Sequence, residues 1–140
     1  MSDIRIGKIS GIDYGNGMVK VTYEDKNNAV SPWLSYFQFN GEYKMPLIGQ
    51  NVIVLVTMNG QGVVLGGYFN KKVSNISAKG KGIFIKELAE KEGNAFISYD
   101  HNTLKMQIAA GIVEIICSGK VISVAELAEK VDKIWEKLEM

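Results

Sequence analysis

The 140-residue chain has little cysteine, histidine or proline, and it has no excess of charge of either sign. Its one cysteine, Cys117, excludes an internal disulfide and indicates synthesis in a reducing compartment. No apolar run approaches the roughly 20 residues that span a bilayer as a helix. The start of the chain lacks the basic-then-apolar layout of a secretory signal peptide. We therefore expect the protein to be made in the cytoplasm.

The formal net charge is +1, with 16 basic and 15 acidic residues. This balance argues against a dedicated nucleic-acid or membrane-surface binder, because such proteins usually carry a basic excess. Apolar residues make up 46% of the chain, which is too many for a disordered protein. The length and composition thus predict a folded protein with either one ordinary domain or a small domain plus an appendage.

Residues 1–70 contain short apolar strands divided by turns. The segment 18–23 alternates as a half-buried strand does, and the Asn- and Gly-rich turn before it accepts positive φ cheaply. The segment 51–57 is apolar on both faces, which predicts a central place in the sheet. Gly66 and Gly67 suit a bend or bulge where a small barrel closes. Five such strands predict a five-stranded Greek-key barrel of the OB type.

The chain changes character after the predicted barrel. Residues 71–82 are rich in Lys, Asn, Ser and Gly without an apolar period, and they predict a linker. Residues 83–122 are short apolar segments separated by turn residues, with a helical composition at Lys86–Glu92 (KELAEKE) that predicts a helical turn. A strand region of this size is rarely stable alone without disulfides or metals. The missing apolar surface must come from the barrel, from the end of the chain, or from other copies.

Residues 123–140 predict an amphipathic helix. Ser123 and Glu126 form a capping box, and Glu126–Lys130 and Glu129–Lys133 are favourable i,i+4 pairs. Apolar side chains recur at steps of 3, 4, 3 and 4, a narrow seam that suits a coiled-coil-like partner better than the chain's own sheet. The predicted self-association interface consists of Val124, Leu127, Val131, Ile134 and Leu138.

A dense aromatic group occupies the middle of the predicted barrel: Trp33, Tyr36, Phe37, Phe39 and Tyr43. OB-type barrels often bind single-stranded nucleic acid by stacking bases on such side chains. Such a site also needs a basic groove, whereas residues 1–70 carry five basic and five acidic side chains. We therefore expect a core or subunit-interface role for these aromatics. Single-stranded nucleic-acid binding is the alternative function.

An ordered set of motifs gives a resemblance to a known family. The motifs are Ile6–Ile9, Met18–Val21, Ser31–Leu34, Pro46–Val54 and Gly62–Asn70. Together, over half the chain, they resemble the OB-type barrel of phage baseplate assembly protein V and its relatives in contractile-tail spikes. The resemblance implies a homotrimer on the tail axis, with a trimeric β-prism or β-helix formed by residues 83–122.

The resemblance also implies a location, a task and partners. The protein would be made in the bacterial cytoplasm and assembled into a phage tail or a tail-like bacteriocin. It would bind a baseplate hub protein and no nucleic acid, and it would contact the target cell envelope transiently while transmitting force. Many spikes of this family end in a metal-binding His-x-His motif, which this chain lacks. This departure implies a blunt spike that a separate spike-tip protein could cap.

Isolated reactive residues give no sign of an enzyme. His101 lies in a predicted turn without a recognisable nucleophile or orienting group. Three copies of it could meet around a metal ion on a threefold axis, but an exposed turn histidine is the more common case. Cys117 follows two isoleucines and is expected to be a buried small hydrophobe. We predict no catalytic residue, no metal site and no cofactor.

Overall fold

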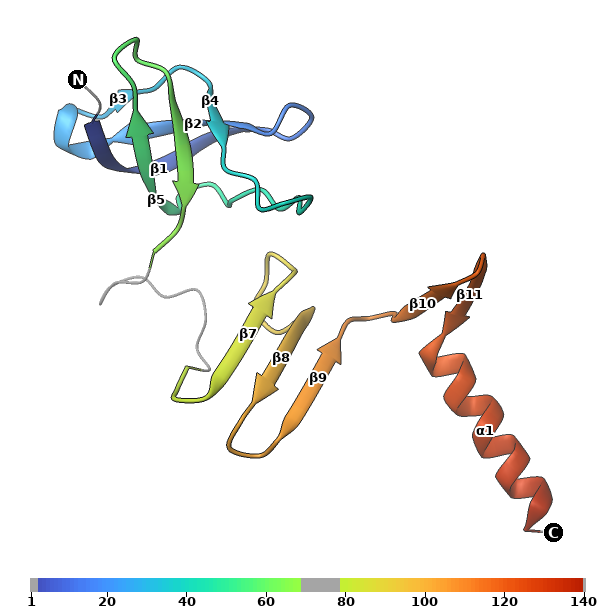
Figure 1. Cartoon of the computed structure of the whole chain (residues 1–140). Coiled ribbons are helices and arrows are strands. Elements are labelled where there is room, and N and C mark those ends of the chain that lie inside the picture. The colour runs from blue at the N-terminus through green and yellow to red at the C-terminus, as the bar shows by residue number, and fades with distance from the viewer. Residues whose placement is uncertain (1–2, 69–78, 140) are drawn as a thin grey trace. The chain divides into compact units, whose positions relative to one another are not determined.

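The structure, a computed structural model, describes residues 3–68 and 79–139 (Figure 1). The chain divides into two compact units, Met1–Ser74 and Asn75–Met140, which we call the barrel unit and the tail unit. The described residues are mostly β-structure, followed by one helix near the end of the chain. Most of the predicted linker, residues 71–82, lies outside the described residues.

The barrel unit is a closed five-stranded β-barrel. Its elements are β1 (Asp3–Asp13), β2 (Met18–Tyr23), the 3-10 turn η1 (Glu24–Lys26), β3 (Ala29–Val30), β4 (Leu34–Tyr36), β5 (Asn51–Val56) and β6 (Gly62–Gly66). The strand order is β1-β5-β6-β4-β2-β3, and β1 also pairs with β2. The long strand β1 closes the ring, because its first half pairs with β5 and its second half with β2. The closed barrel predicted from the sequence is thus confirmed.

The barrel core consists of apolar side chains that alternate along the strands, as the pattern of the segment 18–23 predicts. The buried side chains are Ile9, Val19, Val21, Tyr23, Leu34, Val52, Val54 and Val64. Strand β5 lies between β1 and β6, but in a closed ring every strand has two neighbours, so β5 is no more central than the others. Only one of its faces is covered, because Ile53 and Leu55 point outward from the barrel.

Two glycines allow the chain to bend and pack closely within the barrel. Gly7 lies where β1 approaches β2, and a Cβ placed there would overlap the Val21 side chain and lie 2.9 Å from the Thr22 carbonyl oxygen. Gly66 has a φ of 123° beside a register shift between β5 and β6, so the predicted bulge is present. The absence of side chains at these positions lets a ring of only five strands close.

The tail unit has a different organisation. Strands β7 (Ile83–Glu87), β8 (Phe96–Asp100) and β9 (Lys105–Ala109) form an antiparallel sheet, and β10 (Glu114–Cys117) and β11 (Lys120–Ser123) form a separate hairpin. The helix α1 (Val124–Leu138) follows directly. Figure 1 shows the meander of β7, β8 and β9 in yellow and orange, with α1 at the C-terminal end.

The helical turn predicted at Lys86–Glu92 is wrong. Lys86 and Glu87 belong to β7, and the Leu88 N–H donates a hydrogen bond of 2.9 Å to the Ala95 carbonyl oxygen across the hairpin. A helix of this length cannot repay its nucleation cost without tertiary packing. The cross-strand hydrogen bonds therefore decide the local structure, whatever the helical composition of the segment.

The predicted amphipathic helix is present as α1, within residues 123–140. It begins after Ser123, whose Oγ accepts a hydrogen bond of 3.5 Å from the Glu126 N–H. The ion pairs expected for Lys130 and Lys133 with the glutamates four residues earlier do not form in the described part of the chain. The ammonium groups of these two lysines are therefore not held by their own helix.

Candidate assembly surfaces

The outer wall of the barrel carries a continuous apolar patch on three adjacent strands. Cross-strand registration places Ile4 opposite Leu55 and Leu55 opposite Val63, all on the outer face. This barrel apolar face comprises Ile4, Ile6, Ile53, Leu55, Val63 and Leu65. Ile4 is 70% exposed and Leu55 is 40% exposed. A monomer seldom exposes clustered apolar side chains of this kind, so the face is a candidate contact with another protein chain.

A second exposed surface of the barrel unit is aromatic. Phe37 and Phe39 meet edge to face with ring centroids 6.2 Å apart, and the Tyr43 hydroxyl donates a hydrogen bond to the Tyr14 carbonyl oxygen. The Lys20 ammonium group lies 5.0 Å from the centroid of the Trp33 ring, in cation–π geometry. Trp33, Phe37, Phe39 and Tyr43 are exposed to solvent, although a core role was one of the two roles expected from the sequence.

The predicted core role therefore holds for one aromatic of the group. Tyr36 is half-buried and packs against the barrel core. Trp33, Phe37, Phe39 and Tyr43 are exposed, so the core interpretation is wrong for them. Alternation along the short strand β4 buries Leu34 and leaves the flanking aromatics outside. An interface role for the exposed aromatics stays a prediction.

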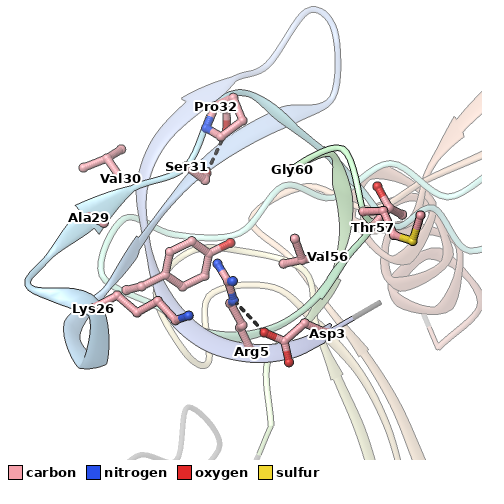
Figure 2. A pocket seen from close by; sticks show the side chains of 12 residues that line it. Asp3, Arg5, Lys26, Ala29, Val30, Ser31, Pro32, Val56, Thr57 and Gly60 are labelled. Carbon is pink, nitrogen blue, oxygen red and sulfur yellow. Dashed lines mark hydrogen bonds and ion pairs between the residues drawn. The ribbon is translucent and has the colours of Figure 1, made fainter. Parts of the chain in front are cut away.

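A recess of about 670 Å³ opens at the barrel end formed by the start of β1, the η1–β3 segment and the β5–β6 turn (Figure 2). Arg5 reaches into it and donates a hydrogen bond of 3.0 Å to Asp3, while its guanidinium lies 5.3 Å from the Tyr23 ring centroid. Lys26 lines the same recess. The two charged groups that β1 contributes to the recess are thus already paired with each other.

Several polar groups that line this recess are held in contacts within the barrel unit. The hydrogen bond from Arg5 holds the pKa of Asp3 below its usual range, and burial raises the pKa of Tyr23. Ser31 Oγ donates to the Pro32 carbonyl oxygen and accepts from the buried Val21 N–H, so this hydroxyl is a structural bridge. Asp3 therefore stays ionised and Tyr23 stays protonated near neutral pH.

The tail unit presents an apolar sheet face. Cross-strand registration puts Phe84, Tyr99 and Met106 in one row, with Ile97 and Ile108 in the next row on the same side. Lys86 is the one charged residue on this tail apolar face, and the opposite face mixes apolar and polar side chains. Phe84, Met106 and Ile108 are each more than half exposed. The sheet therefore lacks the second layer that would make it a core.

The hairpin of β10 and β11 has apolar pairs on both faces. Ile115 lies opposite Ile122 on one face, and Ile116 lies opposite Val121 on the other. Cys117 belongs to the same hairpin and is exposed, so the expectation of a buried cysteine is wrong for the single chain. A two-stranded hairpin has no layer above or below it, and its apolar residues become buried only against another chain or element.

The five predicted interface residues lie on one stripe of α1. Val124, Leu127, Val131, Ile134 and Leu138 are exposed, by between 41% and 73%, and no residue of the helix is buried. The sequence prediction missed Trp135, which is 61% exposed and borders this stripe. Its position one residue after Ile134 could have revealed it, because an apolar residue there widens the 3-4 seam on one side.

His101 lies in the turn between β8 and β9 and is exposed. Its backbone N–H donates to the Gly82 carbonyl oxygen at 2.8 Å, and its ring is tilted against Tyr99. The Asn102 N–H donates to Asp100 and lowers the pKa of that carboxyl group. Among the described residues, no group of three or more possible metal-ligating side chains is found.

Comparisons with known proteins add no family assignment. No protein-family model matches the chain, and no curated protein matches it. Within the described residues, no helix has the length and the apolar character needed to cross a membrane. The candidate site thus consists of contact surfaces: the barrel apolar face, the exposed aromatics, the tail apolar face and the stripe on α1.

Proposed function

We propose that the chain is a structural spike or hub component of a contractile phage tail or a tail-like bacteriocin, and that it acts as a homotrimer on the tail axis. One observation carries the proposal. The described residues of the tail unit, 79–139, include no buried residue, although they carry an apolar sheet face, an apolar hairpin and an apolar helix stripe. Such a unit gains its core by association with other chains.

Copies of the same chain are the simplest source of the missing surface. The exposed apolar side chains lie on the β7–β9 sheet, on the β10–β11 hairpin and on α1, so a partner must contact all three parts of the tail unit. A rotational arrangement of identical chains does this, because each element then meets the same element of its neighbours. Three chains would share one core as a β-prism or β-helix, and paired strand edges would resist compression.

The strand order of the barrel supports the resemblance to the phage baseplate assembly protein V family. The ring order β1-β2-β4-β6-β5, with β4 and β6 parallel, fits a Greek-key barrel of the OB type. In a contractile tail, the barrels would bind a baseplate hub protein, and the tail units would point toward the target envelope and transmit force to it. A separate spike-tip protein would cover the end. Synthesis in the bacterial cytoplasm would precede assembly into the particle.

The mass of the protein in solution tests the proposal. We expect light scattering coupled to size-exclusion chromatography to give the mass of three chains at micromolar concentration. Three chains should associate because the tail apolar face and the α1 stripe become buried in one shared core. A monomer under these conditions would contradict the proposal.

The exposed aromatic surface favours a second candidate, binding of single-stranded nucleic acid. Trp33, Phe37 and Phe39 are available for base stacking, and Lys20 lies beside Trp33. The balanced charge of the unit argues against a continuous basic groove. An affinity for oligonucleotides that falls with rising salt, carried by a monomeric protein, would favour this function over the spike.

A further inference from the structure

We propose that the α1 helices of three copies form a parallel, in-register bundle in which Lys130 of each copy lies over the Trp135 indole of the next. The inference rests on the proposed homotrimer and specifies how its helices meet. It assigns an interaction surface to one side of α1 and names a second copy of the chain as its occupant. It also places Trp135, which lies outside the 3-4 pattern, in the contact between neighbouring helices.

The stripe on α1 is wider than a two-stranded coiled coil needs. With Val124 at heptad position a, the apolar positions a and d are joined by position e, which holds Ala128 and Trp135. A stripe of a, d and e positions covers about three-sevenths of the helix surface, which is broader than the a/d seam of a two-stranded coiled coil and wide enough to contact two neighbouring helices. Val124 at a with Leu127 at d is typical of two-stranded coiled coils, whereas Ile134 at d with Leu138 at a favours trimers or tetramers. The preference for more than two helices thus lies in the second half of α1.

Nothing in the described tail unit covers this stripe within one chain. No residue of α1 is buried, and the large apolar side chains Ile134, Trp135 and Leu138 of its second half are all more than half exposed. The opposite side of the helix carries Glu129, Asp132 and Glu136, which suit contact with water. The stripe is therefore as apolar as a buried helix surface, although its side chains are exposed to solvent in the single chain.

Charge placement selects a parallel arrangement. In parallel helices, position g of one helix faces position e of the next, and this brings Lys130 to Trp135 of the neighbouring copy. A lysine over an indole face is a favourable cation–π contact. In antiparallel helices, g positions face each other, and Lys130 and Lys137 would meet lysines of the neighbour, which is repulsive. The sequence of α1 thus favours one direction.

The lysine is available for this contact. Glu126 lies four residues before Lys130, but no ion pair connects the two side chains in the described part of the chain. The rotational symmetry of three copies requires parallel helices in the same register, which repeats the Lys130–Trp135 contact three times. Two heptads are too short to associate alone, so the bundle forms only when the strands of the tail unit bring the helices together.

Disulfide crosslinking tests the direction of the helices. In the full-length chain with Cys117→Ser, single cysteines are introduced as Val124→Cys, Leu138→Cys or Glu129→Cys. On mild oxidation, we expect disulfide-linked dimers on a denaturing gel for positions 124 and 138, because parallel helices bring like ends together. Glu129 faces outward at position f, so Glu129→Cys is the matched control and should stay uncrosslinked.

The outcomes separate this inference from the proposed homotrimer. A trimer that crosslinks at neither end, or that crosslinks equally at position 129, overturns the bundle and leaves the homotrimer intact. Crosslinks that form only when the Val124→Cys and Leu138→Cys chains are mixed indicate antiparallel helices and also overturn it. A monomeric parent chain overturns the proposed homotrimer itself, and with it the bundle.

A double-mutant cycle tests the Lys130–Trp135 contact directly. Lys130→Gln is expected to raise the dissociation constant of the trimer roughly 2- to 5-fold for each lysine–indole pair that it removes. In a Trp135→Leu background, the same change should have no effect, because the indole is gone. Lys133→Gln, on the outward side, is the control. Equal effects of Lys130→Gln in both backgrounds would overturn the contact.

Discussion

Replacing Val131 and Ile134 together with aspartate is expected to convert the proposed trimer into monomers at micromolar concentration. Both side chains lie at the centre of the α1 stripe, and both are exposed in the single chain. In the bundle, six carboxylates would be buried against one another without partners. At about 2 kcal/mol or more for each aspartate, the dissociation constant should rise by roughly 1,000-fold for each chain. Sedimentation equilibrium measures this shift.

The control keeps the number of new aspartates the same but moves them to the other side of the helix. Glu129→Asp with Lys133→Asp changes two outward positions on the same helix. This variant should remain a trimer, because its carboxylates stay in water. If the Val131 and Ile134 double variant also remains a trimer with an unchanged dissociation constant, α1 is not part of the interface.

Gly7→Ala is expected to destabilise the barrel unit by about 2–3 kcal/mol. The new methyl group would overlap the Val21 side chain inside the barrel and would lie 2.9 Å from the Thr22 carbonyl oxygen. Backbone and core side chains must both shift to admit it, and overpacking of this kind typically costs about 1–3 kcal/mol. Denaturant unfolding of the full chain, followed by near-UV circular dichroism at fixed protein concentration, measures the decrease.

The same strand supplies the matched control. A Cβ at Gly11 would meet its nearest neighbours, in Lys20 and Trp33, at 3.5 Å or more, which is ordinary van der Waals contact. Gly11→Ala should therefore leave the free energy of unfolding unchanged or slightly raise it, because alanine lowers the entropy of the unfolded chain. Equal decreases for the two substitutions would show that the close approach at Gly7 is not what limits the strand.

The barrel could be predicted from the sequence because its core lies within one chain. Val19, Val21 and Tyr23 alternate with more exposed residues, and burial follows that alternation. A different pattern, the continuous apolar run of residues 51–57, predicted a strand with both faces covered at β5. The sequence did not predict that Leu55 and Val63 remain exposed, because an apolar strand does not reveal which element or chain packs against its second face.

The tail unit was less predictable for the same physical reason. The strand at Lys86 and Glu87 depends on hydrogen bonds to a partner strand and not on local propensity. The exposed Cys117 shows that an apolar sequence context does not ensure burial when the single chain has no second layer. Trp135 was missed because a search for a strict 3-4 repeat ignores the apolar residues that flank it.

The division of the chain into a unit with its own core and a unit without one has a consequence for the lifetime of the protein in a cell. The barrel unit leaves the ribosome first and can complete its fold during synthesis. In the proposed homotrimer the tail unit would become resistant to proteases only after assembly, so its survival would depend on the supply of other chains. Chains that remain unassembled would then lose the tail unit to proteolysis, which would leave mainly complete chains in the assembled form.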